Sequence, residues 1–327
     1  MKSSILAVLR ERQDFVSGQE LCDQFQVSRT AVWKGINQLK EDGYDIEAVP
    51  RKGYRLCGSP DSISEVEIRS RLHTAWAADT LYSLATVDST NDYAKKLAED
   101  GAEHGTVVIA DEQTKGKGRR GRTWVTPAGS NIAVSMVVRP SELKPEKASM
   151  MTLLAGMAVA KAVQEVTGLS AGIKWPNDTV LNGKKISGTL TEMSMELGSI
   201  HYLVIGTGIN ANETRFPEEL QQTATSLKCE LGRDVDRAGL ICAYLQAFED
   251  YYDRFMEYQD LRLLVEDYQH LLVNMDREVK VLEPGNEYCG TARGINAAGC
   301  LLVEREDGSI TEVYAGEVSV RGIYGYV

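Results

Sequence analysis

Residues 115–124 read KGKGRRGRTW, and the eight positions from Lys115 to Arg122 hold five cationic side chains and three glycines. Glycine discourages helix formation and lets the backbone approach a ligand closely. Lysine and arginine donate charge-assisted hydrogen bonds that suit phosphate or carboxylate oxygens. The segment is not a Walker A loop, because the G-x-x-x-x-G-K-[ST] spacing is absent. Taken alone, the pattern is also typical of basic surface loops, nuclear-localisation-like runs and nonspecific nucleic-acid patches.

The residues on either side of this segment favour a ligand-binding loop. VVIADEQ (107–113) precedes it and has the composition of a strand, so the loop leaves the edge of a folded sheet. Trp124 follows it, and an aromatic ring beside phosphate-binding cations is suited to stacking on an adenine base.

Further polar clusters lie outward along the chain: DSTN (88–91), KWPND (174–178), NGKKISG (182–188) and GTGIN (206–210). Three of them have an ordinary structural explanation: a helix N-cap for DSTN, a turn for KWPND, and a bulge or turn for the glycines of GTGIN. Asn177, Asp178 and Lys185 are nevertheless close in sequence, and such a set could hold a magnesium-bound phosphate and an acidic substrate.

Around these clusters strands and helices mix, which predicts an α+β domain. We expect strands at 83–91, 105–113, 188–197 and 201–210, and helices at 91–100 (capped by Thr90 or Asn91), 145–168 (ended by Gly168) and 236–256. After about residue 276 short strands follow at 277–283, 288–295, 300–306 and 311–320. They are separated by turn-forming residues, the pattern of a small β-barrel.

The first 57 residues predict a winged helix-turn-helix, with the helix-turn-helix at about 18–37. A helix at about 3–12 is followed by SGQE, a capping box in which Ser17 and Glu20 cap each other's amides. Ser28 then caps a third helix whose buried residues recur at i, i+4 and i+7. The outward-facing residues on that helix and on a basic hairpin are the predicted DNA contacts: Arg29, Thr30, Lys34, Arg51 and Lys52. A three-helix protein-interaction module would have the same core.

Length and charge divide the chain of 327 residues into domains. Residues 1–57 carry nine Lys/Arg against eight Asp/Glu, whereas the other 270 carry 27 against 39. The acidic bulk argues against nucleic acid covering the whole surface. We expect a winged head at 1–57, a linker at 58–64, a catalytic domain at 65–275 and a small barrel at 276–327.

No segment predicts a membrane span or an export signal, because the apolar run MMTLLAGMAVA (150–160) is too short to cross a bilayer. The expected location is the cytoplasm. The six cysteines form no C-x-x-C pair, so neither a zinc site nor a disulfide framework is indicated.

The motifs GKGRRGRTW, DSTN, KWPND, KKISG, GTGIN and GEVSVR (316–321) occur in the order found in biotin protein ligases. With the winged head, the chain resembles the bifunctional bacterial biotin ligases that also repress the biotin operon, over essentially its entire length. The resemblance implies a class II synthetase-like catalytic domain and an SH3-like C-terminal barrel. One departure is Lys117, where many relatives have arginine; lysine keeps the charge but lacks the planar fork.

The resemblance also implies a two-step reaction. Biotin and ATP, with Mg²⁺ whose protein ligands stay unidentified, give biotinyl-5′-AMP. A lysine of a biotin carboxyl carrier protein in a biotin-dependent carboxylase then takes the acyl group. The implied catalytic residues are Lys185, Arg119 and Asp178. The implied biotin contacts are Ser89, Thr90, Asn91, Gln113, Lys117, Gly118, Arg119, Lys185 and Gly188. The implied ATP and adenylate contacts are Arg119, Arg120, Arg122, Trp124, Asn177 and Asn210.

Regulation follows from the same resemblance. Biotinyl-AMP is expected to order the glycine-arginine loop, to promote a homodimer and so to bring two winged heads onto operator DNA. Three alternatives stay open: a lipoate–protein ligase, a transcription factor that only senses a small acidic ligand, and an RNA-binding protein that uses the basic loop. The lipoate ligases lack this loop and the winged head, a pure sensor has no need of phosphate-clamping cations, and the acidic surroundings count against RNA.

Overall fold

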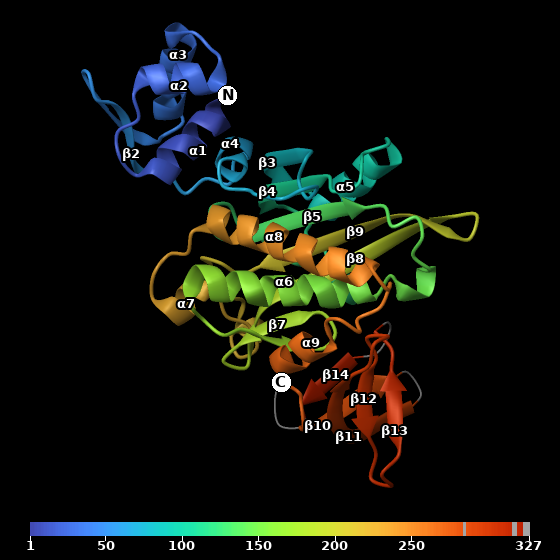
Figure 1. Cartoon of the computed structure of the whole chain (residues 1–327). Coiled ribbons are helices and arrows are strands. Elements are labelled where there is room, and N and C mark those ends of the chain that lie inside the picture. Colours follow the sequence, from blue (N-terminus) through green and yellow to red (C-terminus); the bar gives the residue numbers. More distant parts are fainter. Residues whose placement is uncertain (284–285, 316–318, 323–327) are drawn as a thin grey trace. The chain divides into compact units, whose positions relative to one another are not determined.

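The computed structural model describes residues 1–283, 286–315 and 319–322, which fold into two compact units (Figure 1). The first unit comprises Met1–His73 together with Asp236–Cys242. The second comprises Thr74–Val235 together with the described residues from Ala243 onward.

The first unit contains the predicted winged helix-turn-helix. Its elements are the helices α1 (Lys2–Arg12), α2 (Gly18–Phe25) and α3 (Arg29–Glu41) and the antiparallel strands β1 (Asp45–Val49) and β2 (Gly53–Gly58). One buried cluster joins the three helices, and the predicted inward residues of α3, Val32, Ile36 and Leu39, are part of it. Spacing at i, i+4 and i+7 aligns these three side chains on one side of the helix, so the sequence pattern and the core coincide.

The helix caps of this unit follow the predicted serines. The Ser17 hydroxyl accepts the Glu20 N–H at 3.0 Å and the Ser28 hydroxyl accepts the Ala31 N–H at 3.2 Å. The second half of the predicted capping box is wrong, because the Glu20 carboxylate accepts a hydrogen bond from Arg12 at 2.9 Å instead. An opposite charge at that distance competes successfully with a neutral backbone amide.

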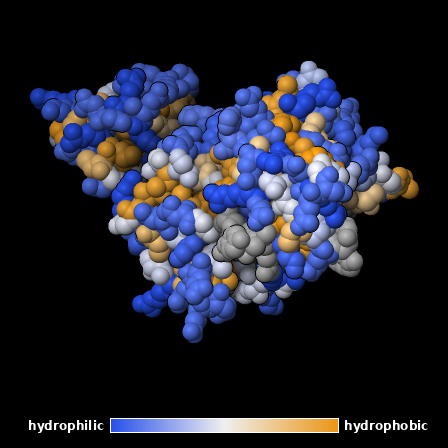
Figure 2. Space-filling model, turned by 90° about the horizontal axis from the view of Figure 1, so that it is seen from below, coloured by the Kyte–Doolittle hydropathy of each residue, from blue (hydrophilic) through white to orange (hydrophobic). Residues whose placement is uncertain are grey.

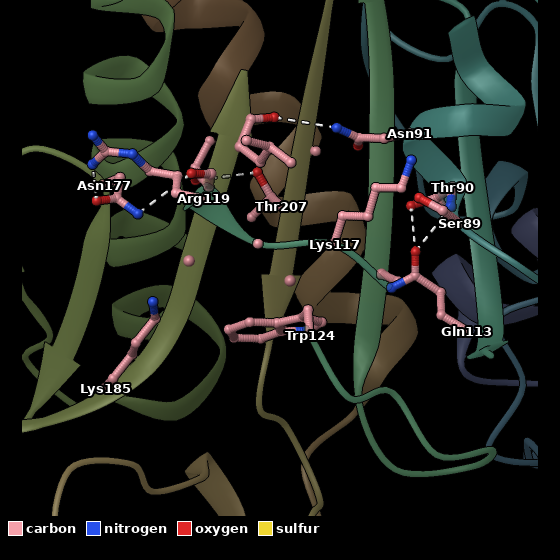
Figure 3. Close-up of a pocket in the computed structure, with 17 residues that line it drawn as sticks. Ser89, Thr90, Asn91, Gln113, Lys117, Arg119, Trp124, Asn177, Lys185 and Thr207 are labelled. Atoms are coloured by element: carbon pink, nitrogen blue, oxygen red, sulfur yellow. Dashed lines mark hydrogen bonds between the residues drawn. The ribbon is translucent and has the colours of Figure 1, made fainter. Parts of the chain in front are cut away.

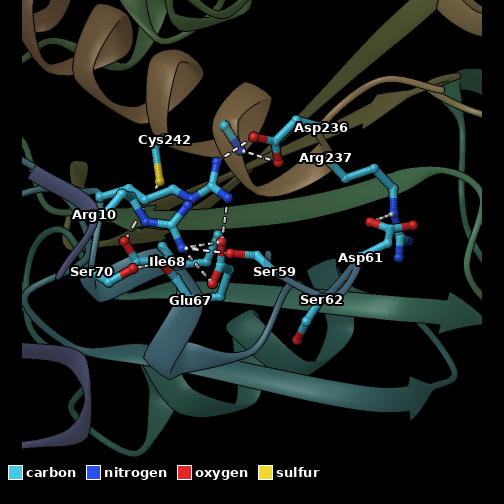
Figure 4. Close-up of polar contacts among 12 residues, drawn as sticks. Arg10, Ser59, Asp61, Ser62, Glu67, Ile68, Ser70, Asp236, Arg237 and Cys242 are labelled. Carbon is cyan, nitrogen blue, oxygen red and sulfur yellow. Dashed lines mark hydrogen bonds and ion pairs between the residues drawn. The ribbon is translucent and has the colours of Figure 1, made fainter. Parts of the chain in front are cut away.

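A buried carboxylate ties the winged head to the rest of the first unit (Figure 4). Glu67 of α4 (Glu65–Arg69) is fully buried and accepts hydrogen bonds from Arg10 at 2.9 and 3.0 Å and from the Tyr44 hydroxyl at 2.6 Å. Arg71 pairs with Glu67 and also with Asp236. A buried charge is tolerated only when it is paired and hydrogen-bonded in this way.

The second unit is built on a seven-stranded sheet with the strand order β3-β4-β5-β9-β8-β7-β6. Only the β3–β4 pair is parallel, and the other five neighbouring pairs are antiparallel. The strands are β3 (Leu81–Val87), β4 (Val107–Gln113), β5 (Ile132–Val138), β6 (Gly172–Lys174), β7 (Asp178–Leu181), β8 (Lys184–Glu196) and β9 (Ser199–Ile209). The predicted neighbouring strands at 188–197 and 201–210 are thus the hairpin β8–β9.

Helices cover both faces of this sheet. α5 (Thr90–Glu99) packs Ala94 and Ala98 against one face, where Val204 of β9 lies. α6 (Met150–Thr167) and α8 (Arg237–Met256) lie on the other face, where the Thr207 hydroxyl of β9 hydrogen-bonds the Tyr244 hydroxyl of α8 at 2.9 Å. Successive residues of a strand point to opposite faces, so β9 serves both layers.

Two helix boundaries differ from the prediction. Ser89, not Thr90 or Asn91, caps α5, because the latter two lie inside the first turn and their side chains bond elsewhere. α6 begins at Met150 rather than at residue 145, since Pro145–Lys147 form a separate 3-10 turn. The predicted end at Gly168 is confirmed: this residue has φ 76°, a left-handed conformation that glycine adopts without strain.

The C-terminal part is the predicted small β domain, a five-stranded antiparallel sheet with the order β13-β12-β11-β10-β14. The predicted single strand at 311–320 is two strands in the structure. The GEVSVR motif lies partly outside the described residues, which resume at Ser319. The strands of this sheet are β10 (Glu278–Glu283), β11 (Asn286–Ile295), β12 (Leu301–Glu304), β13 (Ile310–Val313) and β14 (Ser319–Gly322). Two short helices of the second unit precede this sheet in the chain, α7 (Leu227–Leu231) and α9 (Val265–Leu271).

On the face shown in Figure 2, an apolar spot lies where the β8–β9 hairpin projects at the right. Met193, Met195 and Leu197 of that hairpin are exposed. In the described part of the chain, helix length and apolarity nowhere reach what a bilayer crossing requires.

Candidate functional site

Two glycines of β9 form the floor of the site. Gly206 and Gly208 are two residues apart and therefore point to the same face of the sheet, the face that α5 covers. A Cβ atom at Gly206 would lie 1.8 Å from the Asn91 Oδ1, and one at Gly208 would lie 2.3 Å from the Trp124 indole. The GTGIN glycines are therefore not a bulge or a turn; they leave room for two side chains to lie directly on the backbone.

A first pocket opens on this floor. Figure 3 shows that the start of α5 and the end of β4 form one of its walls. The Gln113 Oε1 accepts hydrogen bonds from the Thr90 N–H at 2.8 Å and from the Thr90 hydroxyl at 3.0 Å. The Gln113 Nε2 donates to the Thr126 hydroxyl at 3.1 Å. These bonds leave no ambiguity in the Gln113 amide orientation, so the wall presents a defined pattern of donors and acceptors.

Asn91 is fixed by partners that the sequence analysis did not identify. Its Nδ2 donates to the Glu192 carboxylate at 2.7 Å, and its Oδ1 accepts from the Ser135 hydroxyl at 2.7 Å. Ser135 interrupts an otherwise apolar and fully buried strand, IAVSMVV (132–138). A lone hydroxyl in such a strand needs a hydrogen-bond partner, and that is the signal by which it could have been found.

The glycine-arginine loop closes over the pocket as a tight turn. The Gly118 N–H donates to the Arg122 carbonyl at 2.7 Å and the Trp124 N–H donates to the Gly116 carbonyl at 2.9 Å. At the tip, Arg120 has φ 57°, a left-handed conformation that a side chain rarely adopts. Strain of this kind is concentrated at ligand-binding segments, where the surroundings hold the backbone in place.

Cations of this loop are held by partners from other elements. The Arg119 guanidinium donates to the Asn177 Oδ1 at 2.6 Å, and the Lys117 ammonium lies 2.6 Å from the Asp92 carboxylate. Burial, together with the nearby Arg120 and Arg122, lowers the pKa of Arg119 below its ordinary value, and Asp178 opposes this only in part. Burial thus disfavours the charged guanidinium, and an anionic ligand beside it would stabilise that charge.

At Asp92 the effect of the neighbouring charges on the pKa exceeds the effect of burial. Burial alone would raise the pKa of Asp92, but hydrogen bonds from Lys117 and Lys95 outweigh this effect and hold the pKa below its ordinary value. Asp92 therefore stays ionised and keeps the Lys117 ammonium beside the first pocket.

A second pocket lies on the far side of the loop and is strongly cationic. Its lining contains five cations and only two carboxylates, Asp178 and Glu213, in a chain whose formal net charge is −11. Phe216, Pro217 and Leu220 add apolar surface. Converging cations beside an apolar wall fit a nucleotide, whose phosphates are charged and whose base is flat and poorly solvated.

Lys185 stands where the two pockets meet. Five residues line both pockets: Gly118, Arg119, Trp124, Asn177 and Lys185. The Lys185 ammonium lies 2.5 Å from the Asp178 Oδ1 and 5.6 Å from the centre of the Trp124 ring. The register of β7 and β8 shifts beside Lys185, and such a bulge re-aims a side chain.

The structure brings the predicted site residues together in two sets. All nine predicted biotin contacts line the first pocket. All six predicted ATP and adenylate contacts line the second, and Asp178 lies beside them. Their binding roles stay predictions. Sequence reasoning missed Arg215 and the apolar residues after it, because a single arginine in a loop carries no spacing signal.

The predicted DNA contacts lie on one part of the first unit. Arg29, Thr30 and Lys34 are exposed on α3, and Arg51 and Lys52 are exposed at the β1–β2 turn. Arg29 and Arg51 line one groove, together with the start of α2. A recognition helix and a basic hairpin on the same groove are the arrangement by which winged heads contact a duplex.

Comparison with known proteins places this architecture in a class. Family models match an HTH domain at residues 2–55, the Biotin/lipoate A/B protein ligase family at 83–210 and the Biotin protein ligase C terminal domain at 275–321. The chain belongs to the biotin protein ligases and is a ligase that carries a helix-turn-helix domain.

Within that class, relatives that are named as both ligase and repressor match nearly the full length of this chain. The Bifunctional ligase/repressor BirA of Bacillus subtilis (strain 168) is 40% identical over 94% of this chain and 94% of its own length. The protein of that name from Escherichia coli (strain K12) is 32% identical over 97% of this chain and 96% of its own length. A biotin protein ligase from Aquifex aeolicus, solved in complex with biotin and ATP, has a TM-score of 0.66 and 32% identity. The match covers 75% of this chain and 99% of the Aquifex aeolicus chain.

Proposed function

We propose that this chain joins biotin to ATP, forming biotinyl-5′-AMP and pyrophosphate, and then transfers biotin to a lysine of a carboxyl carrier protein. The observation that carries the proposal is the shared wall, in which Lys185 and Arg119 line both the polar pocket and the cationic pocket. A carboxylate and a triphosphate repel each other, so their reaction requires cations at the point where they meet. The nine predicted biotin contacts in the first pocket would bind biotin, and the six predicted nucleotide contacts in the second would bind ATP.

In the first step, Lys185 would contact both the biotin carboxylate and the α-phosphate. Negative charge builds on the α-phosphate as the carboxylate oxygen attacks and pyrophosphate leaves, and a positioned ammonium stabilises it. Arg119 would act beside it. Arg120, Arg122 and Lys117, with the loop folded over the product, would keep water from the mixed anhydride.

Mg²⁺ fits this site as the partner of ATP. The described residues contain no group of three His, Cys, Asp or Glu side chains that could form a metal cage. Mg²⁺ needs only one or two carboxylates when phosphates and water supply its other ligands, and Asp178 and Glu213 line the cationic pocket. These two residues would hold the ion, which supplies charge neutralisation on the phosphates.

In the second step, the acceptor lysine attacks the acyl carbon and AMP leaves. The attacking amine must be neutral, so a base has to take its proton. We propose Asp178 for this role. Its carboxylate is held against Lys185 at 2.5 Å and next to Asn177, which donates to it at 3.0 Å.

We further propose that the winged head binds operator DNA as a repressor and that biotinyl-AMP promotes a homodimer, with the protein acting in the cytoplasm. The exposed Met193, Met195 and Leu197 of the β8–β9 hairpin supply apolar surface for such an interface. Sedimentation with and without biotinyl-AMP tests the dimer, and equal association constants would contradict it.

The test of the ligase proposal is biotin-dependent exchange of labelled pyrophosphate into ATP. We expect Lys185→Ala to lower the exchange rate by at least about 100-fold, the scale for removing one electrostatic stabiliser. Lys184→Ala is the matched control, because the Lys184 side chain bonds the Gln221 carbonyl at an exposed position. Exchange that depends on lipoate instead would identify the rival ligase, and no exchange at all would leave a ligand sensor.

A further inference from the structure

Trp33 is an unpacked aromatic residue in the middle of α3. Its side chain is 59% exposed, although tryptophan buries more apolar surface than any other residue when it packs. The described part of the chain provides it with neither a ring contact nor a hydrogen bond. Among the large apolar residues of the first unit, only Met1, at 50%, is also exposed.

Helix geometry places Trp33 in the face that points away from the core. Val32, Ile36 and Leu39 of α3 are buried in the core cluster. Residues three and four apart are neighbours on a helix surface. Trp33 therefore has Arg29 and Thr30 before it and Asn37 after it, with the buried Ile36 at the edge next to the core. An apolar ring thus stands exposed next to the polar side chains Arg29, Thr30 and Lys34.

The charge around this ring selects its partner. Arg29 and Lys34 are exposed on the same helix, and Arg51 and Lys52 are exposed on the hairpin that shares a groove with Arg29. A second copy of this surface would bring like charges together, which is unfavourable. A polyanion would neutralise them.

The major groove of DNA offers an apolar group inside a polyanion, the C5-methyl of thymine, which is the one apolar feature among the base edges. We propose that Trp33 determines sequence specificity by contacting a thymine methyl in the major groove. This proposal rests on the proposed DNA-binding function and adds to it the base that the winged head recognises. Arg29, Lys34 and the wing hold the phosphates and position α3, whereas Trp33 distinguishes thymine from the other bases at one position of each half-site.

The experiment uses the full chain with biotin and ATP and a randomised 40-base-pair duplex library. Repeated selection and sequencing of bound duplexes give the preferred half-site for the unaltered chain, Trp33→Ala and Lys34→Ala. The best duplex is then made with each thymine replaced in turn by uracil, which lacks only the methyl group. Binding is measured at several salt concentrations. Pyrophosphate exchange checks the catalytic unit of each variant, and hydrogen exchange of the α1–α3 amides checks that its winged head is folded.

For the unaltered chain, a single uracil at the sensitive position of either half-site should weaken binding about fourfold, the effect of one buried methyl group. Trp33→Ala should bind the thymine and uracil duplexes equally, and selection should show no preference at that position. Its salt dependence should not change. Lys34→Ala should instead weaken binding to all sequences and reduce the dependence of affinity on salt by about one phosphate contact for each bound head.

Other outcomes overturn the proposal in distinguishable ways. Binding that ignores uracil at every position refutes thymine recognition and leaves DNA binding intact. Trp33→Ala that weakens all duplexes equally, or that changes the dimer constant, assigns the ring to a contact between heads. A chain that selects no duplex at any salt concentration refutes both the DNA-binding function and this inference, while pyrophosphate exchange would still stand.

Discussion

Gly208→Ala tests whether the site requires a glycine floor. The new methyl would lie 2.3 Å from two atoms of the Trp124 indole and 2.8 Å from a third. Ordinary carbon contacts begin near 3.5 Å, so the ring must move by about 1.2 Å. Trp124 lines both pockets, and its backbone N–H donates to the Gly116 carbonyl. The loop therefore moves when the ring moves. A misplacement of this size near reacting groups lowers the rate by about 100-fold, and overpacking costs about 1–3 kcal/mol of stability.

The assay is biotin-dependent pyrophosphate exchange, with the free energy of unfolding measured in parallel. Gly156→Ala is the control, because its new methyl would meet Ile173 at an ordinary 3.7 Å; exchange should be unchanged. Replacing Trp124 by the smaller phenylalanine in the Gly208→Ala background should restore part of the rate. If Gly208→Ala exchanges pyrophosphate at the wild-type rate with unaltered affinity for biotin and ATP, the close approach of Trp124 has no functional role and the reasoning is wrong.

Three further outcomes are expected. Lys117→Met should raise the pKa of Asp92 towards its ordinary value, because it removes a hydrogen bond that lowers it. NMR titration of that carboxyl measures the change, and an unmoved pKa would contradict the pairing. Burial lowers the pKa of His104, against a smaller opposing effect of Asp253. The neutral ring thus adds stability that is fully present above pH 6.5 and is lost as the pH falls through the lowered value, so His104→Gln should flatten acid unfolding curves. Glu67→Ala should remove the carboxylate that pairs with the partly buried Arg10 and Arg71 and lower the free energy of unfolding of the first unit by about 1–3 kcal/mol, as hydrogen exchange would show.

Local patterns in the sequence were sufficient for most elements of the fold. The i, i+4, i+7 recurrence of α3 and the serines before α2 and α3 predicted the winged head, because periodicity and capping depend on residues a few positions apart. Boundaries shifted where a more distant partner competed. Glu20 bonds Arg12 instead of closing its capping box, and Ser89 caps α5 because Thr90 and Asn91 bond other elements.

The residue types of the site were also readable from the sequence, since glycine and arginine in one loop predict an anion site wherever that loop lies. Their arrangement was not. The pocket joins the start of α5, the end of β4, the loop and two strands more than 60 residues further on, and only the strand order β4-β5-β9-β8 makes them neighbours.

The sequence by itself therefore determined the class of chemistry, through the charges and glycines it places in short motifs. The tertiary structure alone decided that Gly206 and Gly208 form a floor, that Ser135 and Glu192 orient Asn91, and that Lys185 stands between the two pockets. The physical reason is that hydrogen bonds and close approaches act over a few ångströms in space. Segments far apart in the chain meet at that distance only after the sheet has formed.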